Sequence, residues 1–313
     1  MAWREALFLT NDDGIEAQGL HHLIRKLHSR GHPLAVLAPA NEQSASGMQL
    51  TLRSGLKFEN RNDLIQKLDL DTDGPPIEIY SLDGTPCDCV IVALDGGFEG
   101  WAPTIRPRMC ISGINRGPNM SIDIMHSGTV SAAREAALYG MPSLAVSLAT
   151  YRHEDYSVGF EVVTEFIDAC LSQIKGEPSN LNRPRGSNFT PWAEEGIDMP
   201  ERLREAFRCG DVFFNLNLPH EWNGNTETVR LGARWYLGAT SGIEIDKTDK
   251  IFEVGAASIQ DEEIPQTDCH SIMTGNVAIT PLATWPQSHP LSMPDAMLHS
   301  ALESNEKGLP SWL

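Results

Sequence analysis

Residues 6–14 read Ala-Leu-Phe-Leu-Thr-Asn-Asp-Asp-Gly, a short apolar run that stops at two adjacent carboxylates and a glycine. Leu20, Leu23, Ile24 and Leu27 follow with the i, i+3, i+4, i+7 spacing that is typical of an amphipathic helix. The apolar run is therefore predicted to be a strand that enters a tight turn, with a helix after the turn.

A second apolar run at residues 34–37 stops at Pro39, and Gly31 marks the end of the helix before it. Strand, helix and strand form a β-α-β unit, which builds parallel sheets with right-handed crossovers. The sequence therefore predicts an α/β fold. Similar patterns predict strands at residues 77–82, 109–112, 143–148, 212–218, 228–231, 251–254 and 277–280, and helices at residues 86–95, 129–139 and 160–170.

The remaining segments suggest how the chain is divided. Residues 48–59 alternate weakly, as an antiparallel excursion would, and residues 60–76 are charged and loop-like. Residues 176–200 carry Pro, Gly, Asn and Ser with little periodicity, which is typical of a surface loop or linker. The part of the chain that follows is β-rich. We therefore expect a core at residues 1–175 and an inserted loop or linker at residues 176–208. We expect a β-rich segment at residues 209–287 and a tail at residues 288–313.

The 313 residues include 24 lysines and arginines against 42 aspartates and glutamates, a formal net charge of −18. This charge argues against a nucleic-acid duplex as partner, because binding to a phosphate backbone takes a basic surface. No apolar run approaches the roughly 20 residues of a membrane-spanning helix, and no secretory signal pattern is apparent. We therefore expect a cytoplasmic protein without a membrane partner. The six cysteines lack C-x-x-C spacing, so we expect reduced, mostly buried thiols.

The adjacent carboxylates Asp12 and Asp13 are the first candidates for a functional site. In an open α/β sheet, ligands bind at the carboxyl ends of the strands. Two carboxylates at that edge repel each other unless a cation neutralises them, and oxygen ligands suit Mg²⁺ or Mn²⁺. The alternative is a solvated turn, in which Asn, Asp and Gly are also favoured.

A second candidate region follows the predicted strand at residues 109–112. Asn115 offers an amide oxygen as a neutral metal ligand. The sequence Ser127-Gly128-Thr129 opens an alanine-rich helix, whose backbone N–H groups can bind phosphate with help from the hydroxyls. Capping by Ser127 alone is the alternative. His126 is a candidate general acid toward a leaving alkoxide, or a packing or solvent-facing histidine. The sequence contains no P-loop or dinucleotide-binding motif.

Five motifs occur in order along the chain: Asn11-Asp12-Asp13-Gly14; Ala38-Pro39 with Gln43-Ser44-Ala45-Ser46-Gly47; Gly84-Thr85-Pro86-x-Asp88-Cys89-Val90; Ser112-Gly113-Ile114-Asn115-x-Gly117-Pro118-Asn119; and Ser127-Gly128-Thr129-Val130-x-Ala132-Ala133. Together they closely resemble the SurE family of stationary-phase survival proteins, metal-dependent phosphatases that act on nucleoside monophosphates. The resemblance runs from about residue 6 to residue 150 and resumes at residues 215–219, 267–268 and 275–282.

The resemblance implies a Rossmann-like three-layer αβα core. It also implies that the β-rich segment completes the fold and mediates formation of a homodimer or homotetramer. One divalent metal ion per subunit, Mg²⁺ or Mn²⁺, is implied as cofactor. The implied metal ligands are Asp12, Asp13, Ser44 and Asn115, and the implied phosphate-binding residues are Asn119, Ser127, Gly128 and Thr129.

The chain departs from the family pattern at two positions, since Ser121 stands where glycine is usual and Asn276 where an aromatic residue is usual. Neither residue is an implied ligand. The loop at residues 176–200 is longer than we expect for the family. Thr85 and Asp88 lie in a family motif but fit a helix N-cap, so we do not assign them to catalysis.

We therefore expect a 5′-nucleotidase that hydrolyses nucleoside monophosphates by attack of water on phosphorus. Asp12 and Asp13 are the candidate catalytic residues, with Asp12 as the candidate base for the attacking water. Nucleoside 3′-phosphates and polyphosphate are further candidate substrates. Two alternatives stay open: a phosphatase with an aspartyl-phosphate intermediate, and a nucleotide or phosphate sensor that binds without turnover.

Overall fold

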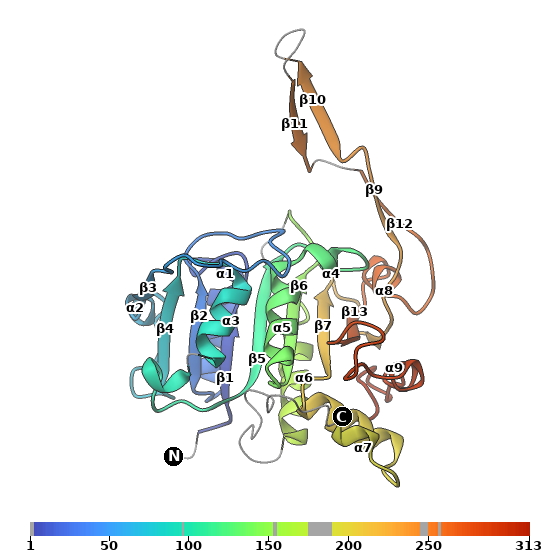
Figure 1. Ribbon diagram of the computed structural model, residues 1–313, viewed down its shortest axis with the longest axis horizontal. Coiled ribbons are helices and arrows are strands. Elements are labelled where there is room, and N and C mark those ends of the chain that lie inside the picture. Colours follow the sequence, from blue (N-terminus) through green and yellow to red (C-terminus); the bar gives the residue numbers. More distant parts are fainter. Residues whose placement is uncertain (1–2, 96, 153–154, 175–189, 245–249, 256–257) are drawn as a thin grey trace.

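A computed structural model of the chain describes residues 3–95, 97–152, 155–174, 190–244, 250–255 and 258–313 (Figure 1). Its centre is a nine-stranded sheet with the order β3-β4-β2-β1-β5-β6-β7-β13-β8. The six strands from β4 to β7 in that order run parallel, whereas β3 and β13 pair antiparallel with β4 and β7. The strands are β1 (Ala6–Thr10), β2 (Leu34–Pro39), β3 (Phe58–Asn60), β4 (Ile77–Leu82), β5 (Pro107–Arg116), β6 (Ser143–Leu148), β7 (Val212–Leu218), β8 (Thr226–Thr228) and β13 (Val277–Ala283).

Helices cover both faces of this sheet, which confirms the predicted three-layer α/β fold. Successive side chains of a strand point to opposite faces, so Leu7 and Leu9 enter one hydrophobic core and Phe8 enters the other. Helices α1 and α6 pack on the first face, and α3 and α5 pack on the second. The helices are α1 (Gln18–Ser29), α2 (Asp63–Lys67), α3 (Pro86–Leu94), α4 (Asp123–His126), α5 (Gly128–Leu138), α6 (Phe160–Gln173), α7 (Met199–Arg208), α8 (Asp268–Met273) and α9 (Asp295–Ser300).

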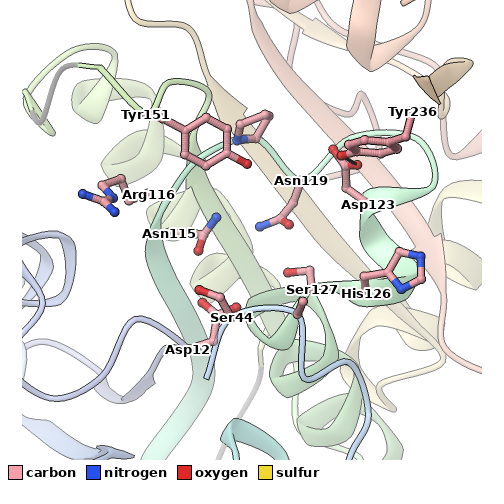
Figure 2. A pocket seen from close by; sticks show the side chains of 12 residues that line it. Asp12, Ser44, Asn115, Arg116, Asn119, Asp123, His126, Ser127, Tyr151 and Tyr236 are labelled. Atoms are coloured by element: carbon pink, nitrogen blue, oxygen red, sulfur yellow. Dashed lines mark hydrogen bonds between the residues drawn. The ribbon is translucent and has the colours of Figure 1, made fainter. Parts of the chain in front are cut away.

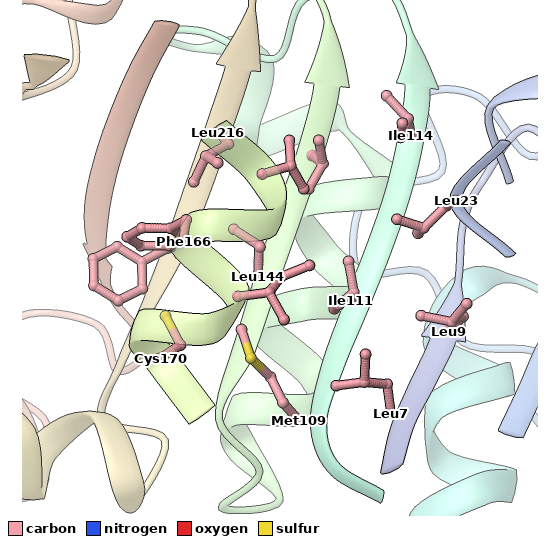
Figure 3. Packing of buried hydrophobic residues seen from close by; sticks show 14 of the residues in the cluster. Leu7, Leu9, Leu23, Met109, Ile111, Ile114, Leu144, Phe166, Cys170 and Leu216 are labelled. Atoms are coloured by element: carbon pink, nitrogen blue, oxygen red, sulfur yellow. The ribbon is translucent and has the colours of Figure 1, made fainter. Parts of the chain in front are cut away.

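The core between the sheet and helices α1 and α6 holds the strands in place (Figure 3). Phe166 of α6 meets Phe214 of β7 edge to face, with ring centroids 4.8 Å apart. Phe214 also stacks on Trp312, at a centroid distance of 5.5 Å, so the C-terminal residues are fixed to the same core. This packing fixes the positions of the strands and therefore of the residues at their carboxyl ends.

Helix α3 begins as the sequence predicts, with Thr85 as its N-cap. The Asp88 N–H donates to Thr85 Oγ1 at 3.2 Å, and the Thr85 N–H donates to Asp88 Oδ2 at 2.8 Å, which forms a capping box. Gly31, predicted to end α1, adopts a left-handed conformation with φ +93° directly after the helix.

Residues 60–76 were predicted to be loop-like but include α2, so this prediction was wrong. Helix α7 and a short 3-10 helix at Pro191–Ala193 lie within the range 176–208 that was predicted to be a linker. The Asp198 side chain caps α7 by accepting the Glu201 N–H at 2.9 Å, a local signal that the Pro- and Gly-rich composition concealed. The part of the linker at residues 176–189 lies outside the described residues.

Two antiparallel strand pairs project from the body of the molecule (Figure 1). Strand β9 (Arg234–Leu237) pairs with β12 (Ser258–Asp261), and β10 (Thr240–Glu244) pairs with β11 (Lys250–Val254). We call these four strands the arm. Of the four, only β11 corresponds to a predicted strand. The predicted strand at residues 228–231 is displaced, since β8 ends at Thr228.

The described helices include none with the length and apolar character needed to cross a membrane. All six cysteines are free and buried, as predicted.

Candidate functional site

The predicted metal ligands come from the ends of three neighbouring parallel strands. Asp12 and Asp13 follow β1, Ser44 lies in the loop after β2, and Asn115 lies near the end of β5. Asp12, Ser44 and Asn115 line one pocket of about 220 Å³ (Figure 2). Asp13 lines a second hollow, and Arg116 borders both. The sheet thus brings all four predicted ligands to one edge, where ligands bind in open α/β sheets.

The turn after β1 is shaped by its own polar residues. Asn11 Nδ2 donates to the Gly14 carbonyl at 2.9 Å. Gly14 has φ +92°, and a Cβ there would lie 3.1 Å from the carbonyl carbon of Asn41, so glycine lets the turn pass close to the next loop. The Gln43 N–H donates to the Asp12 carbonyl at 2.7 Å. This bond joins the Asp12 turn to the loop that carries Ser44.

The loop that carries Ser44 is also held from the other side, by the first turn of α3. Thr85 Oγ1 donates to the Gln49 carbonyl at 2.7 Å, and the Thr51 N–H donates to Asp88 Oδ1 at 3.0 Å. Thr85 and Asp88 therefore cap a helix and fix this loop. These hydrogen bonds give both residues a structural role.

The hydrogen bonds at the site leave oxygen atoms free to bind a ligand. Asn115 Nδ2 donates to the Gly117 carbonyl at 2.8 Å, which leaves Oδ1 available. Ser44 Oγ donates its proton to Glu42 Oε1 at 2.8 Å, so its lone pairs are available. In the described part of the chain, no three His, Cys, Asp or Glu side chains are grouped to hold a metal ion. A metal site here therefore depends on Ser44 and Asn115.

Without a bound cation, the negative charges of Asp12 and Asp13 would repel each other. Burial raises the pKa of Asp12 above its ordinary range, although hydrogen bonds from Thr129 and Gly128 oppose the shift. Burial, followed by the charge of Asp12, raises the pKa of Asp13 to about 7. A bound divalent cation offsets both effects. Two carboxylates, a hydroxyl and an amide oxygen fit a hard divalent ion such as Mg²⁺ or Mn²⁺.

Helix α5 begins against the Asp12 side chain. The Thr129 hydroxyl donates to Asp12 Oδ1, and the backbone N–H groups of Gly128 and Thr129 also bond to the Asp12 carboxylate. A Cβ on Gly128 would lie 2.7 Å from Asp12 Cβ and 2.7 Å from Ser46 Oγ, so only glycine leaves room for this approach. Gly128 and Thr129, predicted to bind phosphate, hold Asp12 in this structure.

The other two predicted phosphate-binding residues, Ser127 and Asn119, line the pocket itself (Figure 2). Ser127 Oγ accepts the Val130 N–H at 3.0 Å, so capping of α5 is confirmed. Asn119 Nδ2 donates to Ser147 Oγ at 2.8 Å. Because the Ser147 hydroxyl can donate or accept, the Asn119 amide can turn over and present Nδ2 to an anion.

Six residues that line the pocket were not predicted as site residues: Ala45, Arg116, Pro118, Asp123, Tyr151 and Tyr236. The Tyr236 hydroxyl donates to Asp123 Oδ1, and Arg234 Nη1 lies 2.8 Å from Asp123 Oδ2. The sequence offered a signal for Tyr151, since this residue follows the predicted strand at residues 143–148 and strand ends border the site. The sequence offered no such signal for Tyr236, because this residue lies in the arm and not at the end of a strand of the central sheet.

The two departures from the family pattern have local explanations. Ser121 adopts φ +51°, in the left-handed region that favours glycine. Its N–H donates to Asp268 Oδ2 at 3.0 Å, and its Oγ accepts the Arg234 N–H at 3.0 Å, so the hydroxyl ties the arm to the body. Asn276 Oδ1 accepts from Asn223 Nδ2 at 2.6 Å.

The chain matches a family model described as Survival protein SurE over residues 7–236. It is 30% identical over 283 residues to 5′-nucleotidase SurE of Geotalea daltonii, covering 88% of this chain and 92% of the relative. It is 42% identical over 211 residues to 5′-nucleotidase SurE of Natranaerobius thermophilus, covering 66% of this chain and 75% of the relative. The crystal structure of the SurE protein from Aquifex aeolicus is similar, with a TM-score of 0.61, 27% identity, and coverage of 90% of this chain and 95% of that chain. The residues matched to the family model include every predicted site residue.

Proposed function

The chain belongs to the SurE family, and from this premise we propose that it is a metal-dependent 5′-nucleotidase. Its reaction is the hydrolysis of nucleoside monophosphates to a nucleoside and inorganic phosphate. One observation carries the proposal. The side-chain oxygens of Asp12, Ser44 and Asn115 face one pocket with Ser127 at the start of α5, and Asp13 lines a second hollow that shares Arg116 with this pocket.

Asp12, Asp13, Ser44 and Asn115 would hold the metal ion. When bound, the ion would supply a Lewis acid that polarises a phosphoryl oxygen and lowers the pKa of a bound water. Thr129 orients the Asp12 carboxylate for this purpose by a hydrogen bond to Oδ1.

Side chains and the start of α5 would carry out the other steps of the reaction. Asp12 is the candidate to accept a proton from the attacking water. Ser127, Asn119 and the positive end of the α5 dipole would hold phosphoryl oxygens and stabilise negative charge as the P–O ester bond breaks. The leaving alkoxide takes up a proton, for which His126 is the candidate donor. Its exposed side chain borders the pocket, beyond Ser127 as seen from Asp12 (Figure 2).

The test is release of inorganic phosphate from a panel of nucleoside 5′- and 3′-monophosphates and polyphosphate, with Mg²⁺, with Mn²⁺ and with a chelator. We expect Asp12→Asn and Asp13→Asn to lose metal affinity and activity together, each by roughly 100-fold or more, because each removes a charged ligand. Asp83→Asn, at an exposed turn outside the pocket, is the matched control. Full activity with bound metal in either site variant would contradict the ligand assignment.

Two further measurements separate the alternatives. Acid quench of the enzyme with substrate labelled in the phosphate group should trap no phosphoenzyme, because we propose direct attack by water. A trapped phosphoenzyme would favour an aspartyl-phosphate intermediate. Nucleotide binding by calorimetry without phosphate release under any metal condition would favour a sensor.

We also propose that the chain forms a homodimer or homotetramer through the arm. Exposed apolar side chains on the arm support this proposal: Trp235, Leu237, Ile251, Phe252 and Val254 are each more than half exposed. Such a surface on a projecting element is typical of an interface.

A further inference from the structure

Strand β7 carries two asparagines, Asn215 and Asn217, inside the central sheet. Both are fully buried, at 0% exposed, although asparagine is depleted in strands. On the other face of the same strand, the core takes the apolar side chains of Phe214, Leu216 and Leu218. A buried amide costs free energy unless it is hydrogen-bonded. The two asparagines therefore call for a role beyond the packing of β7.

Both amides bind the backbone of Asn119, in the loop after β5. Asn217 Oδ1 accepts the Asn119 N–H at 2.9 Å, and Asn217 Nδ2 donates to the Asn119 carbonyl at 3.0 Å. Asn215 Nδ2 donates to the same carbonyl at 2.8 Å. The Asn217 side chain thus pairs with the loop as the backbone of a neighbouring strand would, through one acceptor and one donor. An amide suits this task because it carries both in one plane.

The loop runs from the end of β5 across β6 to β7 and is tied to both of these strands. The Gly117 N–H donates to the Leu148 carbonyl at the end of β6, at 2.9 Å. Asn119 Nδ2 donates to Ser147 Oγ of β6 at 2.8 Å, and Ser147 is the residue of β6 that pairs with Asn217 of β7. Adjacent positions of the sheet therefore hold both the backbone and the side chain of Asn119, whose side chain lines the pocket (Figure 2).

We propose that Asn217 is a positioning residue for the hydrolysis of phosphomonoesters. This inference rests on the proposed function. Asn217 is buried and does not line the pocket, so it acts through Asn119, whose amide is the candidate to hold a phosphoryl oxygen. The proposal gives a role to residues 215–219, where the family resemblance resumes although no site residue was predicted there.

The same loop carries the predicted metal ligand Asn115, which is oriented separately. Asn115 Nδ2 donates to the Gly117 carbonyl at 2.8 Å, and the Gly117 N–H is held by β6 and not by β7. A change at Asn217 should therefore weaken phosphate binding and leave metal binding intact. A general loss of packing in this loop would weaken both.

Asn217→Asp tests this separation, because it keeps the size of the side chain and replaces the Nδ2 donor by an oxygen that faces the Asn119 carbonyl. Calorimetry of the full chain loaded with Mg²⁺ measures the binding of inorganic phosphate without turnover. We expect the variant to bind phosphate roughly tenfold more weakly than wild type, the size of a lost hydrogen bond to a charged group, with a similar fall in kcat for AMP. Mn²⁺ affinity, titrated without phosphate, should stay within about twofold of wild type.

Two further readouts separate positioning from a loss of stability. A protonated carboxyl group at position 217 can donate and accept as the amide does, so the phosphate affinity of Asn217→Asp relative to wild type should recover as the pH is lowered. Asn119→Ala removes the group through which Asn217 acts. Adding Asn217→Asp to Asn119→Ala should therefore change phosphate affinity by less than about twofold.

Thr280→Val is the matched control. Thr280 of β13 is 0% exposed and pairs with Asn215, and its hydroxyl has no hydrogen-bond partner among the described residues. We expect this variant to bind phosphate as wild type does. Ser147→Ala is a milder second variant, which removes only the partner of the Asn119 side chain and should also weaken phosphate binding by roughly tenfold.

Wild-type phosphate affinity in a folded Asn217→Asp, or in Ser147→Ala if Asn217→Asp does not fold, would overturn the proposal. Equal losses of phosphate and Mn²⁺ affinity would also overturn it, because they would show that the whole loop is displaced. Losses that multiply in the double variant would show that Asn217 does not act through Asn119. If the wild type hydrolyses no phosphomonoester, the proposed function is overturned instead, and the phosphate titrations still test the role of Asn217.

Discussion

Gly128 stands at the start of α5, and the Cβ that it lacks decides how closely the helix approaches Asp12. A Cβ there would lie 2.7 Å from both Asp12 Cβ and Ser46 Oγ, closer than side-chain atoms pack. We expect Gly128→Ala to displace the Asp12 carboxylate and to weaken Mn²⁺ affinity by roughly tenfold or more, with a parallel loss of phosphate release. Calorimetric titration with Mn²⁺ measures the affinity without turnover.

Gly100→Ala is the control for Gly128→Ala, because a Cβ on Gly100 meets no atom within 4 Å. Wild-type Mn²⁺ affinity in Gly128→Ala, with only a lower melting temperature, would show that this glycine matters for packing and not for the position of Asp12.

The residues of the site differ in how far sequence alone could identify them. Asp12 and Asp13 could be identified from the sequence because an apolar strand that ends in carboxylates is a local pattern. Ser44 is one hydroxyl in a polar loop, and its place beside Asn115 depends on the order of β2, β1 and β5 in the sheet. Only the ordered motifs of a known family pointed to it. Tyr236 reaches the pocket through contacts with Asp123 that no local pattern encodes.

At the scale of elements, helix α5 carries a buried acid beside α3. Glu135 is 8% exposed, and burial, followed by the charge of Asp88, raises its pKa from 4.5 to about 7. At a pH between these two pKa values, Glu135 keeps its proton in the folded chain and has lost it in the unfolded chain. The contribution of Glu135 to stability is therefore fully present below about pH 4.5. It is lost as the pH rises through about 7, by at most about 3 kcal/mol.

Glu135→Gln should remove this pH dependence, because the amide keeps the size of the side chain and does not titrate. We expect the variant to gain stability relative to wild type as the pH rises from near 4 to near 8. Urea unfolding followed by circular dichroism at a series of pH values measures the difference. Glu161→Gln, on the exposed face of α6, is the control. A difference in unfolding free energy that stays constant with pH would contradict the prediction.

The elements that sequence could predict are those that bury one face or carry a recognisable cap. The central strands alternate between two cores, and α3 begins with the Thr85-Pro86 pair and Asp88. The arm lacks both signals, because its strands pair with each other and are not part of the central sheet. The side chains at residues 235–237, 251–254 and 258–260 are exposed, and of the remaining described ones Arg234 is buried and Asp261 is partly buried. No core-facing alternation was therefore available.

At the scale of the whole molecule, the arm is joined to the body by ion pairs at its base, and its apolar side chains are exposed further out. Arg234 bridges Asp123 and Asp261 at the base. Beyond it, β10 and β11 form a separate two-stranded sheet, with Phe252 66% exposed and Val254 82% exposed. A lone two-stranded hairpin is marginally stable in water. In the assembly that we propose, a second copy of the chain would cover these apolar side chains and so stabilise the strand pair.

Phe252→Lys should weaken this assembly, because in a symmetric interface it places a desolvated charge in each copy. We expect the wild type to have the mass of a dimer or tetramer in size-exclusion chromatography with light scattering, and the variant to shift toward the 34.4 kDa of one chain. Leu52→Lys is the matched control, since Leu52 is 73% exposed on a loop of the body. A wild type that elutes as one chain at every concentration would contradict self-association. An unchanged mass in Phe252→Lys would instead place the interface elsewhere on the molecule.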